Sequence, residues 1–137
     1  MIDGLILNET GAQRTLGYVV DVGRGDGRAR VSLDIHEGHL NRHGALHGGL
    51  VTLLLDSAAG ATASLSRDET GRLPFVTISF TTQFVAPARS GWVTATGRVA
   101  GGGRSLLFVE SELRSDDGTL LATGSGVFKP AHVEPAS

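Results

Sequence analysis

The sequence contains no cysteine among its 137 residues. This absence excludes disulfide bonds, cysteine-ligated zinc and catalysis by a thiol. A chain without cysteine suits a reducing compartment, so we expect a cytoplasmic protein. Aromatic residues are also few, at 5% of the chain, and which of them line a pocket depends on packing that a sequence does not show.

The chain also lacks an excess of charge of either sign. Twelve Lys and Arg residues stand against 14 Asp and Glu, which gives a formal net charge of -2 at pH 7. A protein that binds nucleic acid or a membrane surface needs a basic patch, so we expect neither partner. The first 17 residues have no basic segment followed by a long apolar run, so no signal peptide is predicted.

No repeat, linker or low-complexity segment divides the chain. A length of 137 residues is enough for one domain with a core of its own. We expect a single domain over residues 17–130. An N-terminal arm or short helix at 1–16 would precede it, and a loose C-terminal tail at 131–137 would follow.

One stretch, residues 48–66, is apolar enough to suggest a membrane span. Asp56 is the only charged residue between His47 and Arg67. An Asp at the centre of a membrane-spanning helix costs roughly 2.5–3.5 kcal/mol on insertion scales. We therefore predict a buried helix that other elements cover on most sides.

Apolar residues that alternate with polar ones predict strands before and after this helix. The predicted strands cover residues 17–23, 28–36, 76–84, 92–99, 106–114 and 120–128. Short turns between the last four predict that these strands are antiparallel neighbours. The combination predicts an α+β fold in which a curved antiparallel sheet of about six strands wraps around one long central helix.

The start and the middle of the predicted helix carry complementary chemistry. A helix that begins near Gly48 leaves backbone N–H groups unpaired at its positive end, where they can stabilise an oxyanion. Asp56 supplies a carboxylate that can act as a base or a nucleophile. Eight helical residues separate the two by about 12 Å, which is too far for both to act on one carbonyl group. Two antiparallel copies of the helix would solve this, so the spacing predicts a homodimer with two shared sites.

The residues around the helix start form a recognisable motif. The segment Asn41-Arg42-His43-Gly44-Ala45-Leu46-His47-Gly48-Gly49, followed by Asp56, resembles the hot-dog-fold acyl-CoA thioesterases of the phenylacetate-pathway (PaaI-like) type. That family shows N-x-x-G-x-x-H-G-G, with an Asp seven residues after the second of the paired glycines. The resemblance spans about residues 16–129 and includes 77–80, 85–87, Gly91, 103–105 and 117–118. It is specific for the family and says little about the substrate.

The resemblance implies a role for each matching residue. Asp56 would be the general base or nucleophile, and the Gly48 amide would polarise the thioester carbonyl. His47 and Asn41 would orient the thioester and shape the loop, and Thr77 would help to hold the attacking water. Asn41, His47 and Gly48 would come from one subunit, with Asp56 and Thr77 from the other.

The resemblance also implies partners. Coenzyme A, as part of the substrate, would lie along the dimer surface with its phosphates near Arg104 and Arg89. No metal or redox cofactor is expected. Hot-dog dimers often pair further, so a dimer of dimers (a homotetramer) is expected, although the helix geometry addresses only the two-fold pair.

The same residues have structural interpretations. Asp56 could cap a loop or pair with a buried Arg, and His47 could bond to the helix end. Asn41 could occupy a turn, and Thr77 could be an ordinary strand residue. The segment Gly101-Gly102-Gly103-Arg104 could cradle a phosphate, although a flexible hairpin turn is the commoner explanation.

Four histidines fall within twelve residues, which suggests zinc. They are His36, His39, His43 and His47. The intervening glycines and Asn41 break any helix that would align them, and no cysteine assists. We therefore predict no metal site.

The leading prediction is an enzyme that hydrolyses an acyl-CoA, aryl-acetyl or fatty, to a free acid and coenzyme A. Two alternatives remain open. One is a dehydratase or hydratase acting on 3-hydroxyacyl thioesters. Relatives of that kind usually use a His as acid and base, whereas here His47 precedes Gly-Gly, which favours the thioesterase. The other is a non-catalytic acyl-CoA-binding module.

Overall fold

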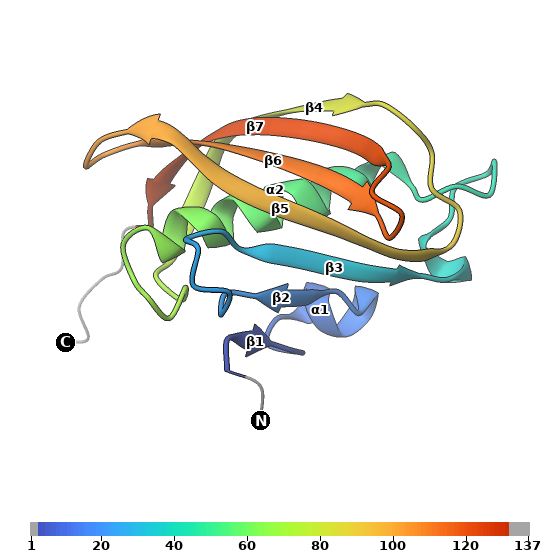
Figure 1. Ribbon diagram of the computed structural model, residues 1–137, viewed down its shortest axis with the longest axis horizontal. Helices are drawn as coiled ribbons and strands as arrows, with labels where there is room; N and C mark the ends of the chain where they lie inside the picture. The colour runs from blue at the N-terminus through green and yellow to red at the C-terminus, as the bar shows by residue number, and fades with distance from the viewer. Residues whose placement is uncertain (1–2, 132–137) are drawn as a thin grey trace.

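A seven-stranded antiparallel sheet curves around one long helix in the computed structural model, which describes residues 3–131 (Figure 1). The predicted architecture of a curved antiparallel sheet around a central helix is confirmed. The predicted tail at 131–137 lies outside the described residues apart from Ala131, as do the first two residues of the predicted N-terminal arm.

The helices and strands follow one another in a simple order. They are β1 (Leu5–Ile6), α1 (Gly11–Leu16), β2 (Val19–Asp21), β3 (Arg30–Ile35), the 3-10 turn η1 (Glu37–His39), α2 (Gly48–Leu65), β4 (Phe75–Phe84), β5 (Gly91–Gly102), β6 (Leu107–Ser115) and β7 (Leu120–Pro130). Strand β1 was not predicted, because two residues are too few to show an alternating pattern.

The strand order across the sheet is β1-β2-β3-β5-β6-β7-β4. The prediction that the last four strands are neighbours in sequence order is therefore wrong for β4, which pairs with β7 and not with β5. The connection at residues 85–90 is extended rather than a tight hairpin. Six extended residues reach about 20 Å, which suffices to pass two strands spaced about 4.8 Å apart.

This connection runs past the start of β7 and returns close to the start of α2. The Val85 and Ala86 N–H groups donate to the Leu121 carbonyl at 2.8 and 3.0 Å, and the Leu46 N–H donates to the Ala88 carbonyl at 2.8 Å. The crossing leaves β4 as an edge strand and covers the region where α2 begins.

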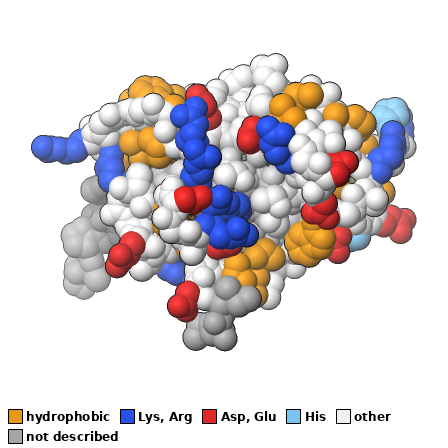
Figure 2. Space-filling view, in the orientation of Figure 1, with side chains coloured by type: hydrophobic (Ala, Val, Ile, Leu, Met, Phe, Trp, Pro, Cys, Tyr) orange, Lys and Arg blue, Asp and Glu red, His pale blue; other side chains and the backbone are white. Residues whose placement is uncertain are grey.

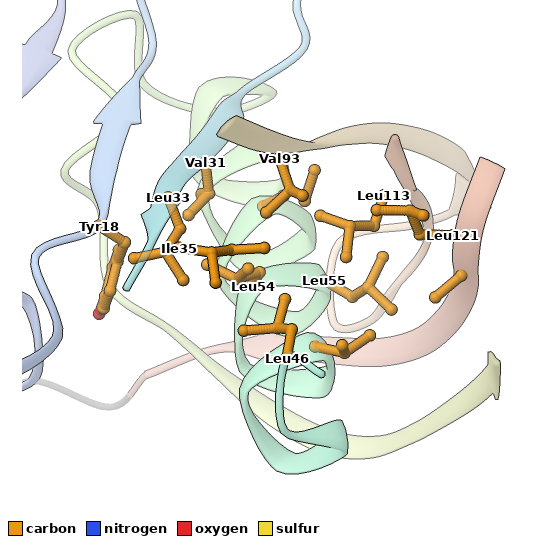
Figure 3. Packing of buried hydrophobic residues seen from close by; sticks show 14 residues of the cluster. Tyr18, Val31, Leu33, Ile35, Leu46, Leu54, Leu55, Val93, Leu113 and Leu121 are labelled. Atoms are coloured by element: carbon orange, nitrogen blue, oxygen red, sulfur yellow. The ribbon is translucent and has the colours of Figure 1, made fainter. Parts of the chain in front are cut away.

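Helix α2 packs one face into the core. Figure 3 shows side chains from α2, β3, β5, β6 and β7 meeting there, with Leu54 and Leu55 at the centre. Gly97 on β5 allows the close approach, since a Cβ at that position would lie 2.2 Å from Thr62 Oγ1. The Thr62 hydroxyl accepts a hydrogen bond from the Ala29 N–H at 3.0 Å and so ties the helix to the chain that enters β3.

The opposite side of α2 is less covered than predicted. Gly48–Leu65 has the length and a mean hydropathy, 1.3, that would suit a membrane span, yet 44% of that window is buried against the sheet. Leu50, Leu53 and Ala61 are only partly buried. A single chain therefore leaves an apolar strip of its central helix open.

The outer face of the sheet is polar and mixed in charge. Figure 2 shows basic and acidic side chains next to one another on this face. Arg98 on β5 pairs with Glu110 on β6, and Arg30 pairs with Asp26 at 2.7 Å. Such exposed ion pairs contribute little to the free energy of unfolding, so the apolar contacts of α2 contribute more to stability than these pairs do.

Candidate active site

The N-terminus of α2 leaves one backbone N–H available. His47 is the N-cap residue, and its Nδ1 accepts a hydrogen bond from the Gly49 N–H at 2.9 Å. The Leu50 and Val51 N–H groups donate to the His47 carbonyl at 2.9 and 3.0 Å. Within residues 3–131, no hydrogen bond uses the Gly48 N–H. That N–H points out of the positive end of the helix dipole, where it can bind an oxygen that gains negative charge.

The loop before α2 is shaped by Asn41. Its Oδ1 accepts hydrogen bonds from the His43 N–H at 2.9 Å and the Ala45 N–H at 3.1 Å. Gly44 closes the turn with φ of +76°, a conformation that favours glycine. Arg89 Nη1 donates to the His43 carbonyl at 2.8 Å and holds the loop from outside. Asn41 therefore occupies a turn, as its structural interpretation proposed, and lies beside the helix start.

Asp56 lies half-buried on α2 and bonds to Thr77. The Thr77 hydroxyl donates to Asp56 Oδ1 at 2.8 Å. Asp56 forms no ion pair with any Arg, Lys or His side chain of the described residues. Burial raises the pKa of Asp56 above its usual range, and the hydrogen bond from Thr77 lowers that pKa by a smaller amount. Such a carboxylate is a better proton acceptor than one at the surface.

A β-bulge brings Thr77 to Asp56. Strict alternation along β4 would place Thr77 on the face opposite Phe80 and Thr82. The register with β7 shifts between Thr77, which pairs with Phe128, and Ser79, which pairs with Val127. Residue 78 is therefore the extra residue, and Thr77 turns to the helix side of the strand. The alternating sequence alone could not show this shift.

A second hydroxyl pair follows from the same arrangement. Thr82 Oγ1 lies 2.9 Å from Thr52 Oγ1, one helical turn before Asp56. Gly48, Thr52 and Asp56 are spaced four residues apart and so form one stripe along α2. This stripe faces β4, the edge strand.

One chain does not bring the two halves of the site together. Asn41, His47 and Gly48 lie at the start of α2, whereas Asp56 and Thr77 lie at its middle. The helix is continuous from Gly48 to Leu65, so about 12 Å of helix axis still separates Gly48 from Asp56. Within one chain, the Gly48 N–H and the Asp56 carboxylate therefore cannot act on the same carbonyl group.

Arg89 and Arg104 also lie far apart within one chain. Arg89 holds the loop before α2. Arg104 lies in the hairpin between β5 and β6, where its carbonyl accepts a hydrogen bond from Arg67 at 3.3 Å, just beyond the end of α2. The 18 residues of α2 span about 27 Å, so a single chain cannot direct both arginines at one group of phosphates.

Three of the four clustered histidines, His36, His39 and His47, have structural partners for their rings. The buried His39 ring accepts a hydrogen bond from the His36 N–H at 3.1 Å through Nδ1, and its Nε2 lies 2.8 Å from the Leu16 carbonyl. The latter contact requires the proton on Nε2 and ties η1 to α1. No group of three or more His, Cys, Asp or Glu side chains within the described range is arranged to hold a metal ion.

A pocket that the sequence did not reveal opens at the start of α2. Its volume is about 300 Å³. Its walls come from the helix start, the 85–88 connection and the facing ends of β6 and β7, and include Gly48, Phe84, Leu113 and Leu121. The crossing connection builds this pocket, and its course was mispredicted.

Known proteins share this combination of sequence and fold. The thioesterase superfamily profile matches residues 43–122. A Pseudomonas aeruginosa protein named as a candidate esterase is 36% identical over 99 residues, which are 72% of each chain. Human acyl-coenzyme A thioesterase 13 is 31% identical over 114 residues, 82% of this chain and 79% of the human one.

Solved structures of related proteins have the same fold. A mutant of the phenylacetic acid degradation protein PaaI from Thermus thermophilus superposes with a TM-score of 0.75 at 28% identity, covering 89% of this chain and all of that one. A Bacillus halodurans protein crystallised with CoA superposes with a TM-score of 0.79 at 25% identity, covering 93% and 82% of the two chains.

The sheet, the central helix and the motif at its start define a hot-dog fold of the PaaI-like type, as the sequence predicted. The superfamily profile covers more than half of the chain. The protein therefore belongs to the thioesterase superfamily and is a thioester hydrolase.

Proposed function

We propose that the protein hydrolyses an acyl-CoA to a free acid and coenzyme A. The observation that carries this proposal is the half-buried Asp56 carboxylate, which has a hydrogen bond from Thr77 and no cationic partner among the described residues. A charged group in such a place costs free energy unless it has a use. The similarity to acyl-coenzyme A thioesterase 13 and to a protein crystallised with CoA supports the choice of coenzyme A.

The proposed chemistry assigns one task to each group. The Gly48 N–H binds the thioester oxygen and stabilises the negative charge that develops on it. Asp56 either takes a proton from the attacking water or attacks the carbonyl carbon and forms an anhydride that water opens. Thr77 holds Asp56, and its hydroxyl lies where it can also bind the water. The C–S bond breaks, and the coenzyme A thiolate leaves and is protonated. No metal or redox cofactor takes part in this scheme.

We further propose that the active form is a two-fold dimer. Strand β4 is an edge strand with an open row of backbone groups, and it exposes Val76, Ile78 and Phe84 by 43%, 55% and 62%. Exposed apolar edge strands favour pairing with another chain. A second copy docked there would cover the open strip of α2. If the partner's Gly48 meets Asp56, the two-fold axis passes near Thr52, midway between them on the stripe.

The dimer also changes the interpretation of the two arginines. With the two-fold axis near Thr52, the end of one α2 would extend about 13 Å past the start of the other. Arg89 of one subunit and Arg104 from the partner subunit would then flank the same site. We propose that these two side chains bind the phosphates of coenzyme A, one from each chain. The structure of a single chain is equally compatible with a further pairing of two such dimers.

A thiol-release assay tests the proposed activity. The chain contains no cysteine, so a thiol reagent reports only the coenzyme A that is set free. Saturated acyl-CoAs should release thiol. Asp56→Asn should lower kcat by about 10²- to 10⁴-fold, the range for loss of a general base. Asp34→Asn, at an exposed position on β3, is the matched control and should keep the wild-type rate.

Three results would contradict the proposal. An unchanged rate in Asp56→Asn would remove that carboxylate from the chemistry. Consumption of enoyl-CoA without thiol release would indicate a hydratase. Tight acyl-CoA binding without turnover would indicate a binding module.

A further inference from the structure

The pocket at the start of α2 borders the Gly48 N–H directly. Gly48 is part of its wall, and a Cβ placed on Gly48 would lie 3.3 Å from Phe84 Cε1, which forms the adjacent rim. A carbonyl oxygen bound to the Gly48 N–H would therefore have its carbon within a bond or two of the pocket. One substituent of that carbon can enter the pocket, and the other substituent must point toward solvent.

The lining of the pocket is apolar and carries no charged side chain. Asn41 is its one polar side chain, and the Asn41 Oδ1 is already occupied by the His43 and Ala45 N–H groups. The other walls are Ala, Leu, Val, Phe, Pro and Gly. A charged or hydroxylated group inside would lose water without gaining a partner. The pantetheine arm of coenzyme A carries two amides, so the acyl group is the better occupant.

The two least exposed side chains of the lining, Leu113 and Leu121, form the floor of the pocket. Figure 3 shows that Leu113 from β6 and Leu121 from β7 pack among the core side chains beside Leu55. Leu113 is 0% exposed and Leu121 is 4% exposed, and both belong to the main core cluster. Protein interiors are close-packed, so these side chains do not yield easily to a longer ligand.

The pocket is open to solvent on one side, and its volume indicates the size of the acyl group that it can take up. About 300 Å³ equals the liquid volume of about ten water molecules at about 30 Å³ each. A methylene group needs about the same space as a water molecule. The pocket thus has room for an acyl chain of about eight to ten carbons, or for an aryl-acetyl group of similar size.

We propose that this pocket binds the acyl group and restricts the enzyme to uncharged, apolar acyl groups of up to about ten carbons. Leu121 and Ala86 are the specificity-determining residues, at the floor and in the wall. This inference rests on the proposed function, because it takes the Gly48 N–H as the carbonyl-binding group. It excludes long-chain fatty acyl-CoAs as preferred substrates.

The test is a chain-length series of straight saturated acyl-CoAs from two to sixteen carbons. In the wild-type protein, kcat/KM should rise by up to about fourfold for each methylene that becomes buried. It should stop rising near ten carbons. Leu121→Ala removes three carbons from the floor and should move that limit up by about two to three carbons. Ala86→Leu adds three carbons to the wall and should move the limit down.

Leu107→Ala is the matched control. Leu107 is a buried leucine on the same strand as Leu113, but it belongs to another core cluster and does not line the pocket. It should lose comparable stability and leave the chain-length limit in place. A uniform loss at every chain length in Ala86→Leu would show that the pocket holds the pantetheine arm, and a wild-type preference for sixteen carbons would also overturn the inference.

A second readout separates this inference from the proposed function. The Kd values of the same series are measured by calorimetry with the Asp56→Asn variant, which needs no turnover. If the limit appears in Kd but no thioester is hydrolysed by the wild-type protein, the proposed function fails and the pocket assignment stands. If hydrolysis occurs without a limit in either kcat/KM or Kd, the pocket assignment fails alone.

Discussion

The Gly48 N–H can be removed without breaking the helix that carries it. Gly48 is the first residue of α2, a position at which proline is tolerated because the missing N–H has no helical partner there. The preceding residue must be extended, and His47 has ψ of +133°, within the range that a following proline favours. Gly48→Pro therefore deletes the proposed oxyanion donor and keeps the backbone path.

The expected magnitude follows from the loss of one donor. Removing a single oxyanion hydrogen bond typically lowers kcat by about 10²- to 10³-fold, or about 2.7–4 kcal/mol. Gly48→Ala is the matched control, since it adds the same Cβ and keeps the N–H. That Cβ would lie 3.3 Å from Phe84 Cε1, so the ring needs to shift by only a few tenths of an ångström.

Thiol release at saturating acyl-CoA measures kcat for both variants, and circular dichroism checks that α2 is retained. Gly48→Pro should fall at least about 100-fold below Gly48→Ala. If the two variants stay within a few-fold of each other, the Gly48 N–H does not stabilise the transition state, and the site assembled around it is wrong.

Three further predictions follow from the same geometry. Inactive Asp56→Asn and Gly48→Pro subunits, mixed by unfolding and refolding, should regain about a quarter of the wild-type activity. Half of the dimers that form are mixed, and each mixed dimer has one intact site out of two. No recovery of activity would refute shared sites. The rate should fall with decreasing pH through the raised pKa of Asp56. Thr77→Val should move this fall to higher pH, because the Thr77 hydrogen bond lowers the pKa of Asp56, and Thr77→Ser should leave it in place. An unchanged pH profile in Thr77→Val would show that Thr77 does not affect the pKa of Asp56. Burial raises the pKa of Asp56 in the folded state, so ionisation of this carboxylate destabilises the folded state as the pH rises from the pKa of the unfolded chain through the pKa of the folded protein. Asp56→Asn should therefore raise Tm at pH 7 and lose this advantage toward pH 4. A difference in Tm that does not depend on pH would contradict burial as the cause.

Much of the site was readable because it is local in sequence. The order of Asn41, His47, Gly48 and Asp56 along one loop and one helix fixes their spacing once the helix is assigned. The helix itself follows from its composition, and its isolated carboxylate predicted a functional role for Asp56. The structure added the detail that the Gly49 N–H donates to His47 Nδ1, which leaves the Gly48 N–H as the available donor.

The sequence could not show the contacts that depend on register or crossing. Thr77 faces Asp56 only because the pairing of β4 with β7 slips by one residue, and a period of two carries no information about such a slip. Strand β4 lies beside β7 because an extended connection crosses the sheet end, and a six-residue connection is equally compatible with a hairpin.

The sequence by itself determined the family and the central helix, and it supplied the two halves of the proposed site, because these depend on composition and on spacing within one helix. Only the tertiary structure decided which face of β4 meets the helix, which strand becomes the open edge, and where a pocket forms beside Gly48. Those features arise from contacts between segments far apart in the chain. Their geometry is fixed by packing, to which many residues contribute and which no single motif encodes.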